Sequence, residues 1–551
     1  MHIQSNPPPA PKNFELPFSL TKKSFNLWVD TINDRLIIHQ AEHIFLVVQT
    51  INQSDTLNKA DMSSFLINVI QKLYPKLQLL KNFLLDCALP ITQREAEISN
   101  YIIWTYIEFA RGLKDSITES KNAKNAATIF YSLQSLIEVY IYSLITYQQP
   151  PELFWKHSYF LYGIACHFKI EKLVIKNIDN DKPHTIFQIF KHLLAIYHCD
   201  LRQFRPREIF FILESLEQQK SDLLLEKHFD PQRKPQYSII DLNTDEEPIK
   251  LTLYEKKQQG ALRFFTAYDA IVNIVTQIKN DNNQQKNTIQ AITQANILQA
   301  AKTLSLSQKR IHKRTYQKNI KLGIIGFTNI INTLKEESSL PEQFEKQIKQ
   351  SSPRVKKGKA FSLIEQEHQK NTPSQSKHFL NKKQLNDDNL QATLDSKYNN
   401  NNIQLTIIDY SIKGYKLEVN LEHVSEKVKI GDLIAIKQSK HLELGFIQRI
   451  MRLDHNRLHL GIKLLSLESN LVFIQAAKDK NFIEWGILLS QFKDRDLLGG
   501  LILEHSKMHN GDYIHIFRDN EEEAEIYQLN KELRINYAFS HIEISKKSTI
   551  V

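Results

Sequence analysis

Apolar residues between positions 14 and 235 recur every three or four residues, which is the period of an amphipathic helix. The stretch after Pro90 shows the pattern well. Thr92 and Glu95 form a capping box at its start, and one apolar stripe follows, made of Ile98, Ile102, Tyr106 and Phe109. Similar stretches, separated by short breaks, fill the region. The pattern predicts an all-α domain over residues 14–235, built as a helical bundle or a helical repeat.

The period changes from 3.6 to 2 after residue 403. The segment RLHLGIKLL (457–465) alternates apolar residues with polar or small ones, as a strand with one buried face does. Further short strands of this kind are YKLEV (415–419), GDLIAIK (431–437) and LGFIQRI (444–450). A second run of short strands extends from about 482 to 546. The pattern predicts antiparallel barrels or sandwiches in the C-terminal third.

These patterns predict an α+β multidomain protein. Its parts would be a disordered tail at 1–13, the helical domain at 14–235, a connecting segment at 236–302, a β-barrel at 303–468, and a small β domain at 469–551. Within the connecting segment, QYSIIDL (236–242) predicts a strand and GALRFFTAYDAIVNIVTQI (260–278) predicts a helix. Residues 337–402 are polar, rich in Lys and Gln, and without sustained periodicity, so we expect a disordered insertion in the barrel.

Composition narrows the class of function. The chain has 551 residues and a net charge of +10, which suits an anionic partner. No run of 18 apolar residues and no signal peptide is found, so we expect a cytoplasmic protein without a membrane span. The three cysteines lack metal-site spacing, and the basic run at 354–359 lacks the aromatics of a nucleic-acid platform. Catalytic motifs are also missing, which predicts a non-enzyme with no catalytic residues, no metal and no nucleic-acid partner.

Two short motifs carry the candidate chemistry. In QKRIHKRTYQK (308–318), Arg310 and Arg314 stand four apart just before an apolar run. In IIDYSIKGYKL (407–417), Asp409, Ser411 and Gly414 form the pattern D-x-S-x-x-G between two strands. We expect Gly414 to take a positive φ, so that the carboxylate and the hydroxyl project from the strand end. Each motif alone is also typical of a solvated basic face or a structural turn.

Taken together, the two motifs resemble the PilZ domain family. The segments VKIGDLIAI (428–436) and LGIKLL (460–465) are similar to barrel strands of that family, and the resemblance covers about 305–335 and 403–468. It implies a six-stranded β-barrel that binds cyclic di-GMP as a ligand, with no further cofactor. The spacing departs from the family, because Arg314 and Asp409 are much further apart than usual. We expect IKLGIIGFTNIINTL (320–334) to supply the first strand, with the insertion as a loop.

The resemblance also implies roles for individual residues. Arg310 and Arg314 would stack on guanine or donate to its O6 and N7 atoms or to phosphate. Asp409 would accept from the N1 and N2 edge of guanine, with the Ser411 hydroxyl beside it and Gly414 in the turn. Lys309 is a further candidate, because this position varies with the number of ligand molecules bound. We expect these side chains to be exposed, so that replacing them leaves thermal stability nearly unchanged.

Two functions follow from these expectations. The first is a cyclic di-GMP receptor that passes the signal to a protein partner through its helical domain, by family analogy in motility, pili or biofilm control. The second is a non-enzymatic scaffold or chaperone-like adaptor with a PilZ-like barrel that does not bind nucleotide.

Overall fold

The computed structural model describes residue 8 and most of residues 14–547. The larger gaps are 306–313 and 341–401, and the shorter ones are 33–35, 55, 86–88, 119–121, 177–182, 252–253, 255–260, 282–287, 425–426, 439–440, 455, 480–481, 493–496, 505–507, 520, 522 and 536–537. Almost all of the predicted tail, most of the predicted insertion, Lys309 and Arg310 therefore lie outside the described residues.

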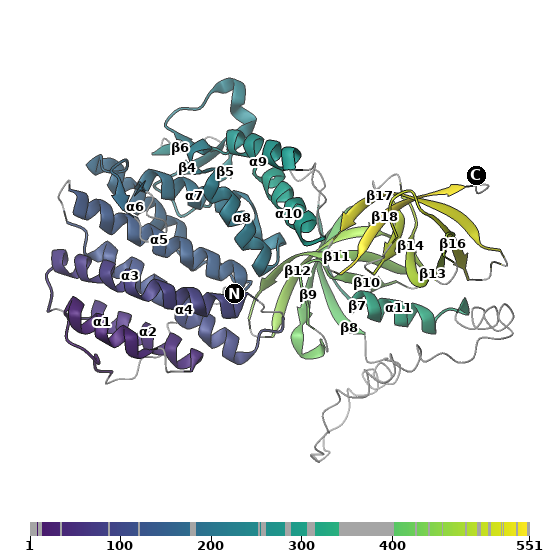
Figure 1. The fold of residues 1–551 in the computed structure, drawn as a ribbon, viewed down its shortest axis with the longest axis horizontal. Coiled ribbons are helices and arrows are strands. Elements are labelled where there is room, and N and C mark those ends of the chain that lie inside the picture. The colour runs from purple at the N-terminus through teal and green to yellow at the C-terminus, as the bar shows by residue number, and fades with distance from the viewer. Residues whose placement is uncertain are drawn as a thin grey trace, which may run out of the picture. The chain divides into compact units, whose positions relative to one another are not determined.

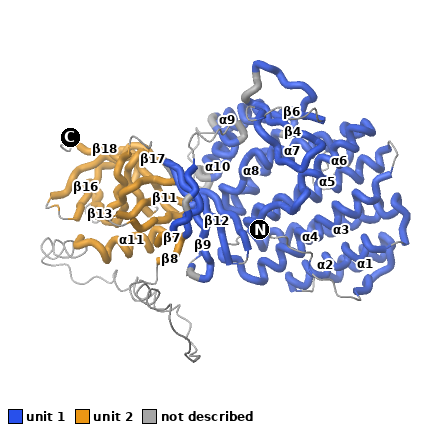
Figure 2. The backbone as a smooth tube through the Cα atoms, turned by 180° about the vertical axis from the view of Figure 1, so that it is seen from behind, with its two compact units in different colours: residues 1–319, 406–430, 447–463 blue, residues 320–405, 431–446, 464–551 orange. Residues whose placement is uncertain are grey.

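The chain divides into two compact units (Figure 2). The first unit comprises residues 1–319, 406–430 and 447–463, and the second comprises residues 320–405, 431–446 and 464–551. Each is described below through the elements it contains.

Helices fill the N-terminal region in chain order (Figure 1). They are α1 (Lys22–Thr31), α2 (Ile37–Asn52), α3 (Lys59–Leu84), α4 (Gln93–Asp115), α5 (Ala123–Ile145), α6 (Phe154–Phe168), α7 (Ile186–His198) and α8 (Pro206–Gln218). Helix α4 begins at the predicted capping box, where Thr92 Oγ1 accepts from the Glu95 amide at 3.2 Å. The stripe predicted behind it is buried, and α4 packs against α2, α3 and α5. The predicted helical region is confirmed.

A four-stranded sheet continues the helical core past residue 235. Its strands are β3 (Leu224–Glu226), β4 (Ser238–Asp241), β5 (Ile249–Lys250) and β6 (Leu262–Thr266), in the order β3-β6-β4-β5. Helices α9 (Tyr268–Asp281) and α10 (Thr288–Ser305) follow. Phe265, Ala270 and Ala301 belong to the same buried cluster as α1–α8. A small hairpin, β1 (Ile175–Lys176) with β2 (Pro183–His184), lies before α7.

The predicted strand at 236–242 is present as β4, whereas the predicted helix at 260–278 is wrong in its first third. That part is strand β6, because Phe264 and Phe265 pair with both β3 and β4 and bury opposite faces of the sheet. A division of the chain at residue 235 would separate β3 from β6, the strand with which it pairs.

The first barrel is closed by six strands. They are β7 (Thr315–Ile325), β8 (Ile403–Ser411), β9 (Gly414–Asn420), β10 (Leu433–Lys437), β11 (Leu442–Arg452) and β12 (Arg457–Ser466), in the order β10-β11-β12-β9-β8-β7. The apolar run after Arg314 supplies the first strand as predicted, but only to Ile325. Gly326, at φ 94°, then turns the chain into helix α11 (Phe327–Glu336).

The second barrel follows after two residues. Its strands are β13 (Ser469–Ala476), β14 (Ile483–Leu489), β15 (Gly500–Leu503), β16 (Tyr513–Arg518), β17 (Glu525–Ile535) and β18 (Ser540–Lys547), in the order β13-β14-β15-β18-β17-β16. Its interior is apolar and includes Val472, Ile474, Leu501 and Ile514. The predicted layout of a helical region followed by β-barrels is confirmed.

Fragments ending on either side of the sheet should differ in stability. Residues 14–305 keep β3 paired with β6 and keep α9 and α10 on the helical core, whereas residues 14–235 expose that part of the core. We expect the longer fragment to unfold in one cooperative thermal transition and the shorter one to melt at a lower temperature with a broader transition. Circular dichroism melting checks this, and equal melting curves would contradict it.

Candidate functional site

The candidate site lies where three strands of the first barrel begin or end. Arg314 immediately precedes β7, Asp409 and Ser411 lie in the last three residues of β8, and Gly414 begins β9. The Arg314 Nη1 atom donates to both carboxylate oxygens of Asp409, at 2.6 and 2.8 Å. The Ser411 hydroxyl faces the Gly414 carbonyl at 3.4 Å, which is a long contact. The structure thus brings together the two motifs that the sequence places far apart.

The ion pair is more buried than the sequence predicted. The Asp409 side chain is 6% exposed, and that of Arg314 is 34% exposed. A carboxylate at this depth needs charged or polar donors, and Arg314 supplies them. The expectation that all site residues are exposed is therefore wrong for Asp409, and removing Arg314 would leave a buried carboxylate without its cation.

Gly414 is required for close packing rather than for a special backbone angle. It is not among the described glycines with positive φ. A Cβ atom at this position would instead collide with the carbonyl oxygen of Ile462 in β12. The predicted positive φ is wrong, because the hairpin places Gly414 directly against the neighbouring strand rather than in the turn itself.

Aromatic and basic side chains around this pair were missed by the sequence analysis. Tyr316, two residues after Arg314, is 77% exposed. Tyr410 is 36% exposed, but it alternates with Asp409 along β8, so its side chain lies on the opposite face of the strand, with its ring centre 6.5 Å from that of Tyr415. An exposed aromatic face such as that of Tyr316 can stack on a nucleobase. Lys413 stands inside the D-x-S-x-x-G motif, and Lys463 is the pairing partner of Gly414. Their charges favour anionic groups, and their positions in and opposite the motif were the available signal.

The same part of the barrel also perturbs a histidine. Burial lowers the pKa of His459, and repulsion from the neighbouring Lys416 lowers it further. His459 pairs with Glu418 across β12 and β9.

Within the described parts of the chain, no cluster of three or more His, Cys, Asp or Glu side chains could hold a metal ion. One described helix, α5, is long and apolar enough to cross a membrane, and 94% of its most apolar window is buried inside the protein.

Family models match two consecutive parts of the chain. Residues 23–231 match the model described as the N-terminal domain of the cyclic-di-GMP receptor FimW, and residues 238–470 match its middle PilZ domain. Together the two matches cover well over half of the chain. The chain belongs to the FimW family of cyclic di-GMP receptors.

The FimW middle-domain match contains Arg314, Asp409, Ser411 and Gly414. The resemblance to PilZ domains is thereby confirmed, and the function of the chain is that of a cyclic di-GMP receptor. The match begins at residue 238, the first residue of β4, and so includes α9 and α10 as well as the first barrel. No curated protein and no solved structure matches the chain.

Two Gly→Ala replacements show whether Gly414 is needed for close packing or only for backbone flexibility. Gly414→Ala forces a methyl group into the Ile462 carbonyl, and we expect it to lower the free energy of unfolding by about 1–3 kcal/mol. Gly163→Ala, in helix α6, is the control, because its Cβ would meet no atom within 4 Å. It should be neutral or stabilising by about 0.5–1 kcal/mol. Denaturant unfolding of both variants checks this, and equal effects would contradict the packing role.

Proposed function

We propose that cyclic di-GMP binds where the two motifs meet, held by Arg310, Arg314, Asp409, Ser411 and Gly414, with Lys309 as a further contact. The observation that carries this proposal is the paired Arg314 and Asp409 at the junction of β7 and β8. The receptor is non-enzymatic, acts in the cytoplasm, and passes the signal to a protein partner through its helical domain.

The chemistry of the pair fits an exchange of partners. The N1 and N2 edge of guanine presents two parallel donors, which match the two oxygens that Asp409 now offers to Arg314. Once guanine satisfies this carboxylate, the Arg314 guanidinium is free to stack on a base or to bind guanine O6 and N7 or a phosphate. The nucleotide therefore replaces the pairing of Arg314 with Asp409 by two new ones. Asp409 pairs with guanine, and Arg314 pairs with a base or a phosphate, so that both charged groups keep a partner.

The surroundings of the pair support the same ligand. Tyr316 offers an exposed aromatic face, and Lys413 and Lys463 add positive charge next to Gly414. A ligand with two guanine bases and two phosphates would use both kinds of group. In this proposal Tyr316 is a stacking residue and the lysines attract the phosphates.

The turn between α7 and α8 links the candidate site to the helical domain. Gln203 donates to Thr303 Oγ1 at 3.1 Å and accepts from Gln299 at 2.7 Å, which fixes the end of α10. Arg310 and Arg314 follow five and nine residues after the last residue of α10, and β7 begins directly after Arg314. Nucleotide binding by these arginines would therefore act on a helix that is anchored in the helical core.

The same turn also holds the barrel. Arg205 Nε donates to the Ile430 carbonyl, which precedes β10, at 2.8 Å, and Asp200 forms an ion pair with Arg449 of β11. Because one turn contacts both the helix before the arginine linker and the barrel after it, nucleotide occupancy can change the helical surface that a partner reads.

Nucleotide titration of arginine variants tests the site. Arg310→Lys and Arg314→Lys keep the charge but lose the planar fork and the stacking face. Charge-assisted contacts of this kind contribute roughly 1.5–3 kcal/mol, so we expect each variant to bind cyclic di-GMP about 10- to 150-fold more weakly. Isothermal titration calorimetry measures this.

Lys318→Ala is the matched control, because Lys318 is an exposed cation on the same strand, four residues after Arg314. It should bind within about twofold of the parent chain at the same salt concentration. If both arginine variants bind as well as this control, the proposed site is wrong. If the parent chain does not bind at all, the adaptor function takes its place.

A further inference from the structure

The two barrels have the same strand order. When the strands of each are numbered one to six along the chain, neighbours around the first barrel run one, two, three, six, five, four. The second barrel, from β13 to β18, gives the same sequence of neighbours. Six strands can close a barrel in many orders, so shared order with shared antiparallel pairing indicates a repeated unit.

Sequence and backbone details repeat at matching places. The fourth strand of each barrel is entered through Gly-Asp-x-Ile-x-Ile, which is GDLIAI at 431–436 and GDYIHI at 511–516. Gly431 and Gly511 have φ values of 91° and 92°. The isoleucines that follow them are buried in both barrels. Unrelated barrels would rarely share a glycine with positive φ at the same position before the same strand, so this agreement supports a common origin of the two barrels.

The motif glycine has a counterpart as well. Gly414 begins the third strand of the first barrel, and a Cβ there would meet the carbonyl oxygen of Ile462 in the sixth strand. Gly500 begins the third strand of the second barrel, and its Cβ would meet the carbonyl oxygen of Ile542, also in the sixth strand. The close approach of these two strands is thus the same in both barrels.

The second barrel lacks the chemistry of the first at these places. Its second strand ends with Ile487 and Leu489, where the first barrel has Asp409 and Ser411. No arginine linker precedes its first strand either, because β12 ends at Ser466 and β13 begins at Ser469. Neither the guanine-reading carboxylate nor the paired arginines have a counterpart.

Helix α11 occupies the apolar surface that results. Ile487 and Leu489 are 0% and 4% exposed, and they share a buried cluster with residues of α11, namely Phe327, Ile330, Ile331 and Leu334. The cluster also includes Leu433 and Ala435 of β10, so the helix packs on a strand of the first barrel as well. Beyond the end of the helix, Ser338 donates to Asp519 of the second barrel at 3.2 Å, and Ser339 at 2.5 Å. The helix is thus held by apolar packing and by hydrogen bonds at its C-terminal end.

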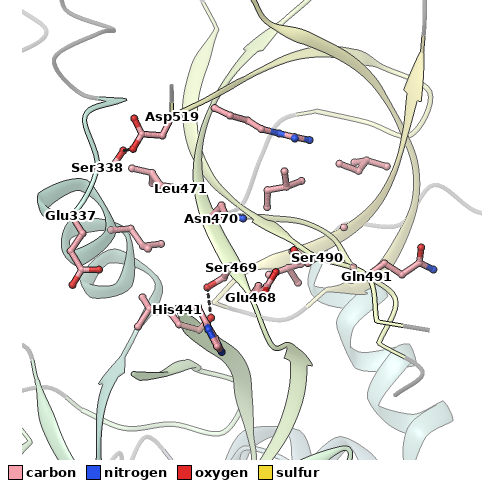
Figure 3. A pocket seen from close by; sticks show the side chains of 18 of the residues that line it. Glu337, Ser338, His441, Glu468, Ser469, Asn470, Leu471, Ser490, Gln491 and Asp519 are labelled. Atoms are coloured by element: carbon pink, nitrogen blue, oxygen red, sulfur yellow. Dashed lines mark hydrogen bonds between the residues drawn. The ribbon is translucent and has the colours of Figure 1, made fainter. Parts of the chain in front are cut away.

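A cavity of about 1120 Å³ lies beside this contact (Figure 3). Ser490 and Gln491 line it from the connection between the second and third strands, the same connection that carries the nucleotide motif in the first barrel. Its charged lining is mainly acidic, and its cations are already paired, Lys437 with Glu337 and Arg518 with Glu525. Such a lining disfavours a ligand that carries two phosphates.

We propose that the C-terminal barrel is a second copy of the nucleotide-binding barrel, in which α11 has taken the place of the nucleotide. The chain then has one nucleotide-binding barrel and one helix-binding barrel. This rests on the proposed nucleotide site in the first barrel. Since β7 follows Arg314 directly and continues through Gly326 into α11, the second barrel holds the far end of the strand that begins at the ligand.

Cyclic di-GMP binding to the full chain tests the first half of this proposal. Arg314→Ala should lose all saturable binding, whereas Arg518→Ala, which removes the arginine in the cavity of the second barrel, should bind within about twofold of the parent. Saturable binding that survives Arg314→Ala and is lost on adding Arg518→Ala would overturn it. A parent chain that binds nothing would instead overturn the proposed nucleotide site and leave the helix-binding role to the next test.

Substitutions on β14 test the helix-binding half. Leu489→Asp places a carboxylate under α11, and we expect the melting temperature to fall by about 4 °C or more, with faster amide hydrogen exchange in 327–336. Ile483→Asp, on the same strand but 37% exposed, should change neither quantity. Leu489→Met keeps an apolar side chain of similar size, so amide exchange in 327–336 should stay as slow as in the parent chain. Equal exchange in 327–336 for Leu489→Asp and Ile483→Asp would overturn the role of the second barrel in holding α11.

Discussion

The ion pair between Arg314 and Asp409 is the contact on which the proposed nucleotide site depends. It joins the residue that ends the arginine linker to a strand that follows much later in the chain. A carboxylate that is almost completely buried needs donors, and Arg314 supplies them. In the proposed function, the ligand takes the place of Arg314 by offering Asp409 equivalent donors. The proposal therefore favours a base edge with two parallel donors, as guanine has.

The elements on both sides of this pair are fixed at their far ends. Before the linker, α10 is held by Gln203 in the turn between α7 and α8. After it, β7 continues into α11, which packs on the second barrel. Arg314 thus stands in the chain between two packed helices, nine residues after the end of α10 and 13 residues before the start of α11. In the proposed function, an exchange of partners at Arg314 acts on these helices through the chain that joins them.

Much of the fold could be read from the sequence, because it depends on local patterns. The helical period, the capping box at Thr92 and the alternation in β12 each report on residues close together in the chain. Strand β6 was mistaken for helix because its apolar residues run on into those of α9, and only pairing with β3 and β4 separates the two. The strand order of the second barrel could not be predicted either, because strand pairing joins residues that lie far apart in the chain. The repeated Gly-Asp-x-Ile-x-Ile was nevertheless visible in the sequence.

The sequence predicted which residues form the candidate site, and that prediction stays untested, but it did not predict their arrangement. The motifs identified Arg314, Asp409, Ser411 and Gly414, and the structure brings these four together. The contact between Arg314 and Asp409 could not be foreseen, because the two motifs lie far apart in the sequence and do not show which of their groups pair with one another. The role of Gly414 was misjudged because the constraint comes from Ile462, on a strand that is remote in sequence.

A crystal structure of the chain with cyclic di-GMP bound would test the exchange of partners most directly. The account predicts that the Asp409 carboxylate accepts from the N1 and N2 edge of a guanine, and that the Arg314 guanidinium has left it to contact a base or a phosphate. A nucleotide bound elsewhere, with Arg314 still donating to both oxygens of Asp409, would contradict the account.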